Sequence, residues 1–246
     1  MKAIYRISDA GYAKEKPSYI DNDQCLNNFT SIFDDVQIIA DNCSEETLKM
    51  INKHVLKEQI TEVSIGSGAG TFNLALDMAL KYDDEEIIYF VENDYLHLRN
   101  SDKILEEAFS LGASFVTLYD HIDKYMDPNK GGNPYCAGGA EDTRVYLTKS
   151  IHWKLTNSTT MTFAAKVSTL KRVEPILRKH TTGSYPHDFD MFLELRAQNE
   201  LLVSSIPAYS THGETKWLAP LVDWSTVSAV TSPQKYFPYI NKDVEE

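Results

Sequence analysis

The sequence predicts an α/β fold built on a mainly parallel, Rossmann-like sheet with helices on its faces. Short apolar runs alternate along the chain with segments whose apolar residues recur at helical spacing. Strands that alternate with helices in this way form right-handed βαβ units, which produce parallel sheets. Residues 87–91 (IIYFV) are apolar throughout, as is typical of a strand that is covered on both faces.

The first half of the chain supplies the alternating elements. Five strands are predicted there, over residues 3–7, 36–40, 60–65, 87–91 and 114–120. Asp21 or Asn22 is expected to cap a helix that runs through Phe33, because short polar side chains accept hydrogen bonds from the first free amides. Ser44 should begin a second helix and Ser101 a later one for the same reason.

The pattern changes after residue 120. Residues 127–142 hold four Gly and two Pro, which predicts a mobile loop that orders when ligands bind. Residues 144–157 and 159–170 are expected to be consecutive strands, which could pair as a hairpin. Helices follow over residues 167–180, with a break near Pro175, and over 187–199. A last strand ends at His212.

Composition excludes several classes of function. The chain of 246 residues carries a net charge of −12, whereas nucleic-acid-binding surfaces need basic groups that replace counterions. No apolar run approaches the ~18–20 residues of a membrane span, and the N-terminus lacks the apolar region of a signal peptide. Three scattered cysteines favour reduced thiols and a cytoplasmic location.

An acidic turn follows the most apolar strand. Glu92, Asn93 and Asp94 come directly after residues 87–91, and ligands of open α/β sheets bind outside the carboxyl ends of the strands. Two acids repel each other there unless a positive group lies between them. A divalent cation with an attached diphosphate meets that need, because hard cations take carboxylate and phosphate oxygens together. The alternative is a surface turn with two solvated acids.

The order of these features resembles the nucleotide-sugar-binding half of the GT-A glycosyltransferases, especially the large family-two group. That group has a Gly-containing loop, a helix with an Asn, a strand and an Asp-x-Asp turn. Gly70, Asn73, the strand and the Glu92–Asp94 turn follow the same order here, with Glu in place of the first Asp. The resemblance covers roughly residues 3–212. It implies a single domain over 1–246, with a nucleotide-binding half (1–120), a mixed acceptor-side half (121–216) and a C-terminal tail (217–246).

The resemblance also implies roles for individual residues. Asp94 would bind the divalent cation, Mn²⁺ or Mg²⁺, with His212 beside the same metal and diphosphate. The implied nucleotide-binding residues are Arg6, Asp9, Asp41, Gly70, Asn73 and Glu92. The glycines of residues 66–70 do not form a phosphate loop, because the following Lys-Ser/Thr is absent. They are expected to make a tight turn that lets the base approach the backbone.

Asp188, at the start of the helix over 187–199, matches the position of the general base in inverting family members. It would deprotonate the acceptor hydroxyl while the nucleotide diphosphate leaves. The alternative is an acid that only favours the helix dipole. Trp217 and His187 are candidates for contacts with a sugar or acceptor.

The sequence thus predicts a metal-dependent glycosyltransferase that moves a sugar from a nucleotide-sugar, such as a UDP- or GDP-sugar, to a hydroxyl of a glycan or small molecule. Inversion of configuration is favoured. The alternative is a non-catalytic nucleotide- or sugar-binding module on the same fold, since a fold does not carry an activity by itself. A sugar nucleotidyltransferase is set aside, because the segment after the first strand lacks a Gly-rich basic phosphate loop.

Overall fold

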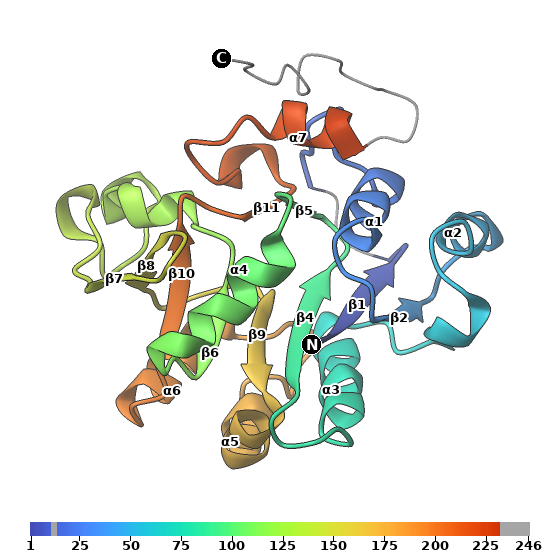
Figure 1. The fold of residues 1–246 in the computed structure, drawn as a ribbon, viewed down its shortest axis with the longest axis horizontal. Helices are drawn as coiled ribbons and strands as arrows, with labels where there is room; N and C mark the ends of the chain where they lie inside the picture. Colours follow the sequence, from blue (N-terminus) through green and yellow to red (C-terminus); the bar gives the residue numbers. More distant parts are fainter. Residues whose placement is uncertain (11–13, 232–246) are drawn as a thin grey trace, which may run out of the picture.

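The structure, a computed structural model, describes residues 1–10 and 14–231. Their centre is a nine-stranded sheet with helices on both faces, and a two-stranded sheet lies above it (Figure 1). The α/β prediction is confirmed. The strands are β1 (Lys2–Ser8), β2 (Val36–Asp41), β3 (Ile60–Val63), β4 (Ile87–Glu92), β5 (Tyr95–His97), β6 (Phe115–Thr117), β7 (Val145–Leu147), β8 (His152–Leu155), β9 (Phe163–Lys166), β10 (Leu202–Ile206) and β11 (Ser210–His212).

The order of strands creates a crevice at one edge of the large sheet. That order is β3-β2-β1-β4-β9-β6-β10-β8-β7, and β1 pairs in parallel with both β2 and β4. The chain therefore runs outward from β1 to β3 and then returns to the other side of β1. Ligands of open α/β sheets bind at such a reversal, outside the carboxyl ends of the strands. The acidic turn after β4 lies at this point.

The sheet is mixed in its second half, as expected. β9 lies between β4 and β6 and is antiparallel to both. β7 and β8 form a hairpin within residues 144–157, and β8 pairs antiparallel with β10. The predicted hairpin between 144–157 and 159–170 is therefore wrong, because β9 pairs with buried central strands instead.

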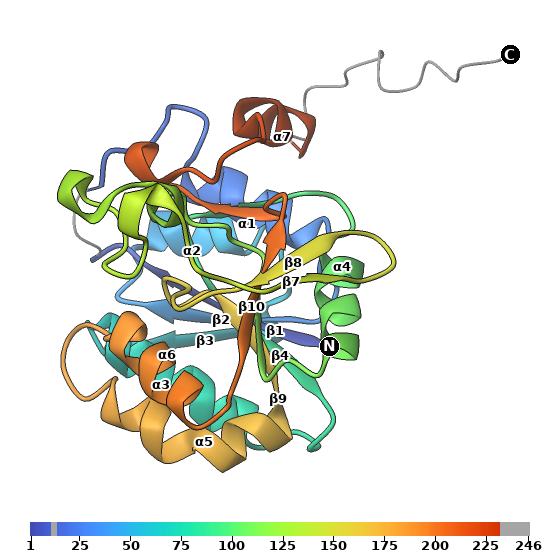
Figure 2. The ribbon, with the colours of Figure 1, turned by 90° about the vertical axis from the view of Figure 1, so that its left-hand side faces the viewer.

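Helices cover the two faces unequally (Figure 2). The helices are α1 (Asn22–Thr30), α2 (Glu45–Ile51), α3 (Gly68–Ala79), α4 (Ser101–Ala108), α5 (Val167–Lys179), α6 (Asp188–Ala197) and α7 (Trp224–Thr231). In Figure 2, α3, α5 and α6 lie below the sheet, whereas α1, α2 and α7 lie above it. Ile104 and Leu105 of α4 belong to the same core as Phe29 of α1. None of the described helices is long and apolar enough to cross a bilayer.

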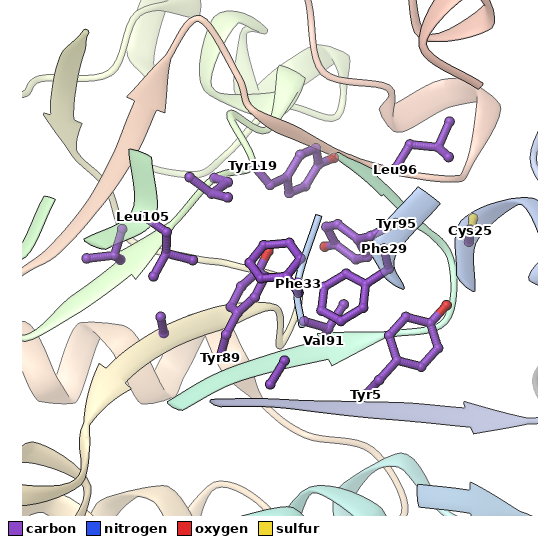
Figure 3. Close-up of a cluster of buried hydrophobic side chains, with 14 of the residues drawn as sticks. Tyr5, Cys25, Phe29, Phe33, Tyr89, Val91, Tyr95, Leu96, Leu105 and Tyr119 are labelled. Carbon is purple, nitrogen blue, oxygen red and sulfur yellow. The ribbon is translucent and has the colours of Figure 1, made fainter. Parts of the chain in front are cut away.

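Two hydrophobic cores follow from this layering, one on each face of the sheet. Figure 3 shows part of the upper core, where Phe29, Phe33 and Tyr89 meet beside β4. The rings of Phe29 and Phe33 are stacked with centroids 4.5 Å apart. Alternating residues of β4 enter opposite cores, so that Phe90 packs below the sheet on Phe72 of α3. This two-sided burial explains why residues 87–91 are apolar throughout.

Local predictions mostly hold. The Asp21 side chain accepts a hydrogen bond from the Gln24 amide and caps α1, and Ser44 caps α2. Ser101 is instead the first residue of α4, after Asn100 in a left-handed conformation. The expected break at Pro175 is wrong, because α5 is continuous through it. Pro175 lies on the exposed side, where water can replace the hydrogen bond that the proline lacks.

Two further segments differ from expectation. The last predicted strand, residues 201–212, is two strands, β10 and β11, in different sheets. Within the predicted tail, residues 217–246, helix α7 packs on α1 and β5. Residues 232–246 lie outside the described residues.

Candidate active site

A cavity of about 940 Å³ opens at the crevice beyond the carboxyl ends of β1, β2 and β4. Its walls come from the turn after β4, the loop that precedes α3, the segment that precedes α6, and residues after β6 and β11. The segment from β1 to α1 also contributes, through Lys14 and Lys16. A space of this size is in the range of small-molecule and cofactor sites.

The pairing of β5 with β11 brings Asp94 and His212 together. His212 is the register partner of Tyr95, the residue after Asp94. The His212 Nε2 and Asp94 Oδ2 atoms are 3.3 Å apart, and both side chains are only 4% exposed. Gly213 allows this approach, because a Cβ there would lie 2.7 Å from the Asp94 carbonyl oxygen. The contact expected from the sequence between a strand-end histidine and the acidic turn is therefore present.

Two lysines complete this cluster. The Lys14 ammonium donates to Asp94 Oδ2 at 2.8 Å, and its nitrogen lies 3.0 Å from His212 Nε2. Lys16 Nζ lies 3.9 Å from the same carboxylate oxygen. Burial favours the neutral acid, but His212 and the two lysines outweigh it and hold the pKa of Asp94 well below its usual range. Asp94 is therefore a carboxylate at neutral pH.

The chemistry of this cluster fits a cation that takes few protein ligands. Asp94 Oδ2 and His212 Nε2 converge on one point, and their 3.3 Å separation suits two ligands of one ion. Asp94 Oδ1 is buried and has no hydrogen-bond partner among the residues that the structure describes. Across residues 1–10 and 14–231, no group of three or more His, Cys, Asp or Glu side chains is placed to hold a metal. A divalent ion here would thus complete its shell with oxygens from water or a ligand such as phosphate.

Glu92 turns away from this pair toward Arg6. Their side chains meet at 3.2 Å, between Arg6 Nη2 and Glu92 Oε1. Arg6 is buried and also donates to the carbonyls of Gly68 and Met161. Burial raises the pKa of Glu92 against the opposing effect of Arg6, and it lowers the pKa of Arg6. The pair forms a polar floor of the cavity and holds the loop before α3.

Asp41 and Asp9 hold backbone segments at the cavity rim. Asp41 is buried, and its carboxylate accepts the amides of Ile65 and Gly66. Asp9 accepts the Ser44 amide at the start of α2. Burial of Asp9 raises its pKa, but its hydrogen bonds outweigh that effect and leave the pKa below the usual value. Both residues line the cavity, so contact with a nucleoside stays a prediction for each.

Gly70 and Asn73 are not brought to the cavity lining formed by the described residues. A Cβ on Gly70 would lie 2.4 Å from a methyl group of Ile65, so this position needs glycine for the tight turn into α3. The Asn73 amide bonds to the Thr181 carbonyl and hydroxyl. Their positions support roles in packing, and we do not carry them forward as nucleotide ligands.

Asp188 lies at the cavity as the first residue of α6. Its Oδ2 accepts the amides of Thr159 and Thr160. Thr160 and Met161 both have positive φ, at 48° and 55°, so the carboxylate stabilises a turn that L-residues rarely adopt. One carboxylate oxygen is thus engaged by the backbone, and Oδ1 is left for another partner.

The remaining candidates separate clearly. Trp217 lines the cavity, and its ring lies 5.2 Å from that of His121, centroid to centroid. His187 is not part of the described lining, and its amide donates to the His180 carbonyl. Sequence reasoning missed His121, Lys14 and Lys16. The lysines could have been noticed, because basic residues after the first strand lie near the same edge as the acidic turn.

Comparisons with known proteins support the fold. No protein-family model matches the chain, and no curated protein matches it. Among solved structures, GalNAc-T7 with UDP, GalNAc and Mn²⁺ is similar at a TM-score of 0.53 and 10% identity, over 88% of this chain and 44% of that one. S. aureus TarS 1-349 has a TM-score of 0.49 and 16% identity, over 85% of this chain and 60% of that one. A CMP:2-keto-3-deoxy-manno-octonic acid synthetase with CTP has a TM-score of 0.46 and 10% identity, over 82% of this chain and 88% of that one.

The similarity to GalNAc-T7 identifies the fold. The chain has a GT-A-like fold of the kind found in nucleotide-sugar transferases, as the sequence resemblance implied. It spans about 60% of the TarS chain and 44% of the GalNAc-T7 chain. At these identities the likeness is one of fold, and the activity is a separate question.

Proposed function

We propose that this protein transfers a sugar from a nucleotide-sugar donor to an acceptor hydroxyl. The observation that carries the proposal is the buried Asp94–His212 pair, which meets the cavity at the carboxyl end of β4, where the strand order reverses. A diphosphate is the ligand that suits this position, because its charge matches the lysines and its oxygens match a hard cation. A UDP- or GDP-sugar is the expected donor.

The nucleoside would lie on the β1–β2 side of the cavity. Gly66 and Ser67 form the loop there, and Asp41 fixes the Gly66 amide. Gly66 has a φ of +73°, a conformation that favours glycine. A loop held by a buried carboxylate is a rigid surface against which a base can pack.

The diphosphate end would meet the cluster of Asp94, His212 and Lys14. A divalent cation, Mn²⁺ or Mg²⁺, held by Asp94 and His212 would supply positive charge for the departing diphosphate. Asp94 contributes a carboxylate that is charged at neutral pH. Lys14 and Lys16 add positive charge beside Asp94, which favours a negatively charged diphosphate at this end of the cavity.

Asp188 is the proposed general base. Its Oδ2 is held by the amides of Thr159 and Thr160, so the carboxylate is oriented before the acceptor binds. It would take the hydroxyl proton as the diphosphate leaves, which gives inversion. His121 and Trp217 supply a wall of rings on which an acceptor sugar can stack.

The three free thiols suit the reducing cytoplasm.

A donor panel tests this function. UDP- and GDP-sugars are incubated with the protein and Mn²⁺, and release of the nucleoside diphosphate is measured with and without candidate acceptors. We expect release that depends on one donor and is lost in Asp94→Asn. Binding of a donor in calorimetry without any release under acceptor screening would favour the non-catalytic module. Absence of both binding and release would reject a nucleotide-sugar site.

A further inference from the structure

Lys14 holds the position that the proposed cation would take. Its Nζ lies 2.8 Å from Asp94 Oδ2 and 3.0 Å from His212 Nε2. A metal ion bound by the same two atoms would be about 2.1 Å from each. On the side of the pair where Lys14 lies, such an ion would nearly coincide with the ammonium nitrogen. The two positive groups therefore exclude each other.

Of the three residues, Lys14 is the one that can leave. Asp94 is fixed by the end of β4, and His212 by the pairing of β11 with β5. The Gly213 amide donates to the Asp94 carbonyl and fastens these segments together. Lys14 instead reaches the pair from the segment between β1 and α1, on a flexible stem, and its side chain is 14% exposed against 4% for Asp94.

Charge balance sets what happens when a donor enters. In the donor-free protein, Lys14 is the lysine nearest to the buried Asp94 carboxylate, at 2.8 Å against 3.9 Å for Lys16. A buried carboxylate needs such a counter-charge. A diphosphate brings several negative charges into the same cavity and attracts the ammonium. Once Lys14 turns to the phosphates, Asp94 and His212 are open to a divalent ion, which also gains phosphate oxygens as ligands.

We propose that Lys14 is a further donor-binding residue, which neutralises Asp94 in the donor-free protein and passes to the diphosphate when donor and divalent cation bind together. The inference rests on the proposed function for the identity of the donor. It makes the cation and the diphosphate bind with positive coupling. Such coupling is reciprocal and typically amounts to about 5–150-fold in affinity.

The first test measures Mn²⁺ binding by electron paramagnetic resonance, with and without UDP. In wild type, UDP should tighten Mn²⁺ binding by about tenfold or more. In Lys14→Met, Mn²⁺ alone should bind about tenfold more tightly than it does to wild type, because the competing ammonium is gone. Lys16→Met is the matched control: its ammonium is 3.9 Å from Asp94, and its effect on Mn²⁺ affinity should be clearly smaller.

The second test measures UDP affinity in excess EDTA, where no metal contributes. Lys14→Met should bind UDP about tenfold more weakly than wild type, because a phosphate contact is lost. Lys49→Met, which removes an exposed lysine on α2, controls for the change in net charge. Thermal melting checks that each variant is folded, and Lys14→Gln replaces Lys14→Met if the latter is not.

Clear outcomes overturn the inference. If Lys14→Met binds Mn²⁺ alone no more tightly than wild type, or if Lys16→Met matches its gain, exchange at Lys14 is rejected. Unchanged UDP affinity in EDTA rejects the phosphate contact. These binding measurements do not depend on turnover. They therefore test the inference about Lys14 even if the donor panel shows no sugar transfer.

Discussion

Two clusters of buried charge in the described part of the chain can be compared: the first lines the cavity described above, and the second does not. The donor cluster is Asp94, His212 and Lys14, after β4. The loop cluster is Asp120, Glu141 and Lys154, beyond β6. In the loop cluster, the Lys154 ammonium is 2.9 Å from a carboxylate oxygen of Asp120 and 2.9 Å from one of Glu141.

The difference between the clusters lies in where the positive charge comes from. Lys154 belongs to strand β8, and its side chain is only 3% exposed. It joins the chain after β6 to the end of the loop at 127–142. Lys14 comes from a surface segment and faces a cavity. Burial of charge therefore does not identify a functional site by itself. We propose that a functional site is indicated instead by a buried charge whose counter-ion, here Lys14, can be exchanged for a ligand.

The largest effect is expected from a substitution that removes the cation of the loop cluster. Lys154→Met should lower the free energy of unfolding by about 3–5 kcal/mol, because two carboxylates stay buried without their cation. Chemical denaturation measures this. Lys166→Met is the matched control, since Lys166 pairs with an exposed glutamate and should cost about 0–1 kcal/mol. Folded Lys154→Met should keep the wild-type affinity for UDP and Mn²⁺. A loss of that affinity would mean that the two clusters are not separate.

The next effect concerns Asp188, whose carboxylate combines a structural and a proposed chemical task. Asp188→Ala should lower kcat by about a hundredfold or more and leave UDP affinity intact, the size expected for a lost general base. Asp188→Asn separates the two tasks, because its amide oxygen can still accept from Thr159 and Thr160 but cannot take a proton. Equal losses in both variants support the base. Near wild-type activity of Asp188→Asn would assign Asp188 to the turn alone.

A smaller effect distinguishes the donor cluster by its response to acid. The pKa of Asp94 is held below its usual value in the folded protein. Its contribution to stability is therefore present above the unfolded pKa, about 4, and is lost as pH falls below it. A tenfold difference in proton affinity between the folded and unfolded states corresponds to about 1.4 kcal/mol. Melting temperatures from pH 7 to pH 3 should fall more steeply for wild type than for Asp94→Asn. Parallel curves would contradict a charged, compensated Asp94.

The sequence allowed the donor side of the fold to be predicted because its signals are local. Residues 87–91 are buried on both faces and hence apolar, and helix caps such as Asp21 act within one turn. The position of His212 followed from the resemblance, and the structure places it beside Asp94. Its role toward a metal stays a proposal.

The missed features depend on contacts between distant segments. Lys14 lies 80 residues before Asp94. Its place after the first strand indicates which edge of the sheet it lies near, but not which acid it contacts. The Arg6–Glu92 pair spans 86 residues, and it forms because parallel strands β1 and β4 are adjacent. The antiparallel insertion of β9 between β4 and β6 is likewise set by packing, since short apolar strands carry no signal for their neighbours.

The smallest expected effect concerns the loop at 127–142, which ends beside the loop cluster. The loop follows His121, which lines the cavity, and Glu141 near its end pairs with Lys154. It is partly organised already, because the amides of Asn133 and Cys136 donate to backbone carbonyls. We therefore expect little change in hydrogen exchange at those two amides. Exchange at 137–142 should slow when UDP, Mn²⁺ and an acceptor bind, by about 1 kcal/mol of opening free energy or less. Apart from Glu141, residues 137–142 are mostly Ala and Gly, so they have few side chains to bury and a bound ligand is the main source of added order. Equal protection of 127–142 with and without ligands would contradict a loop that closes over the acceptor, and would leave it as a static wall fixed by Lys154.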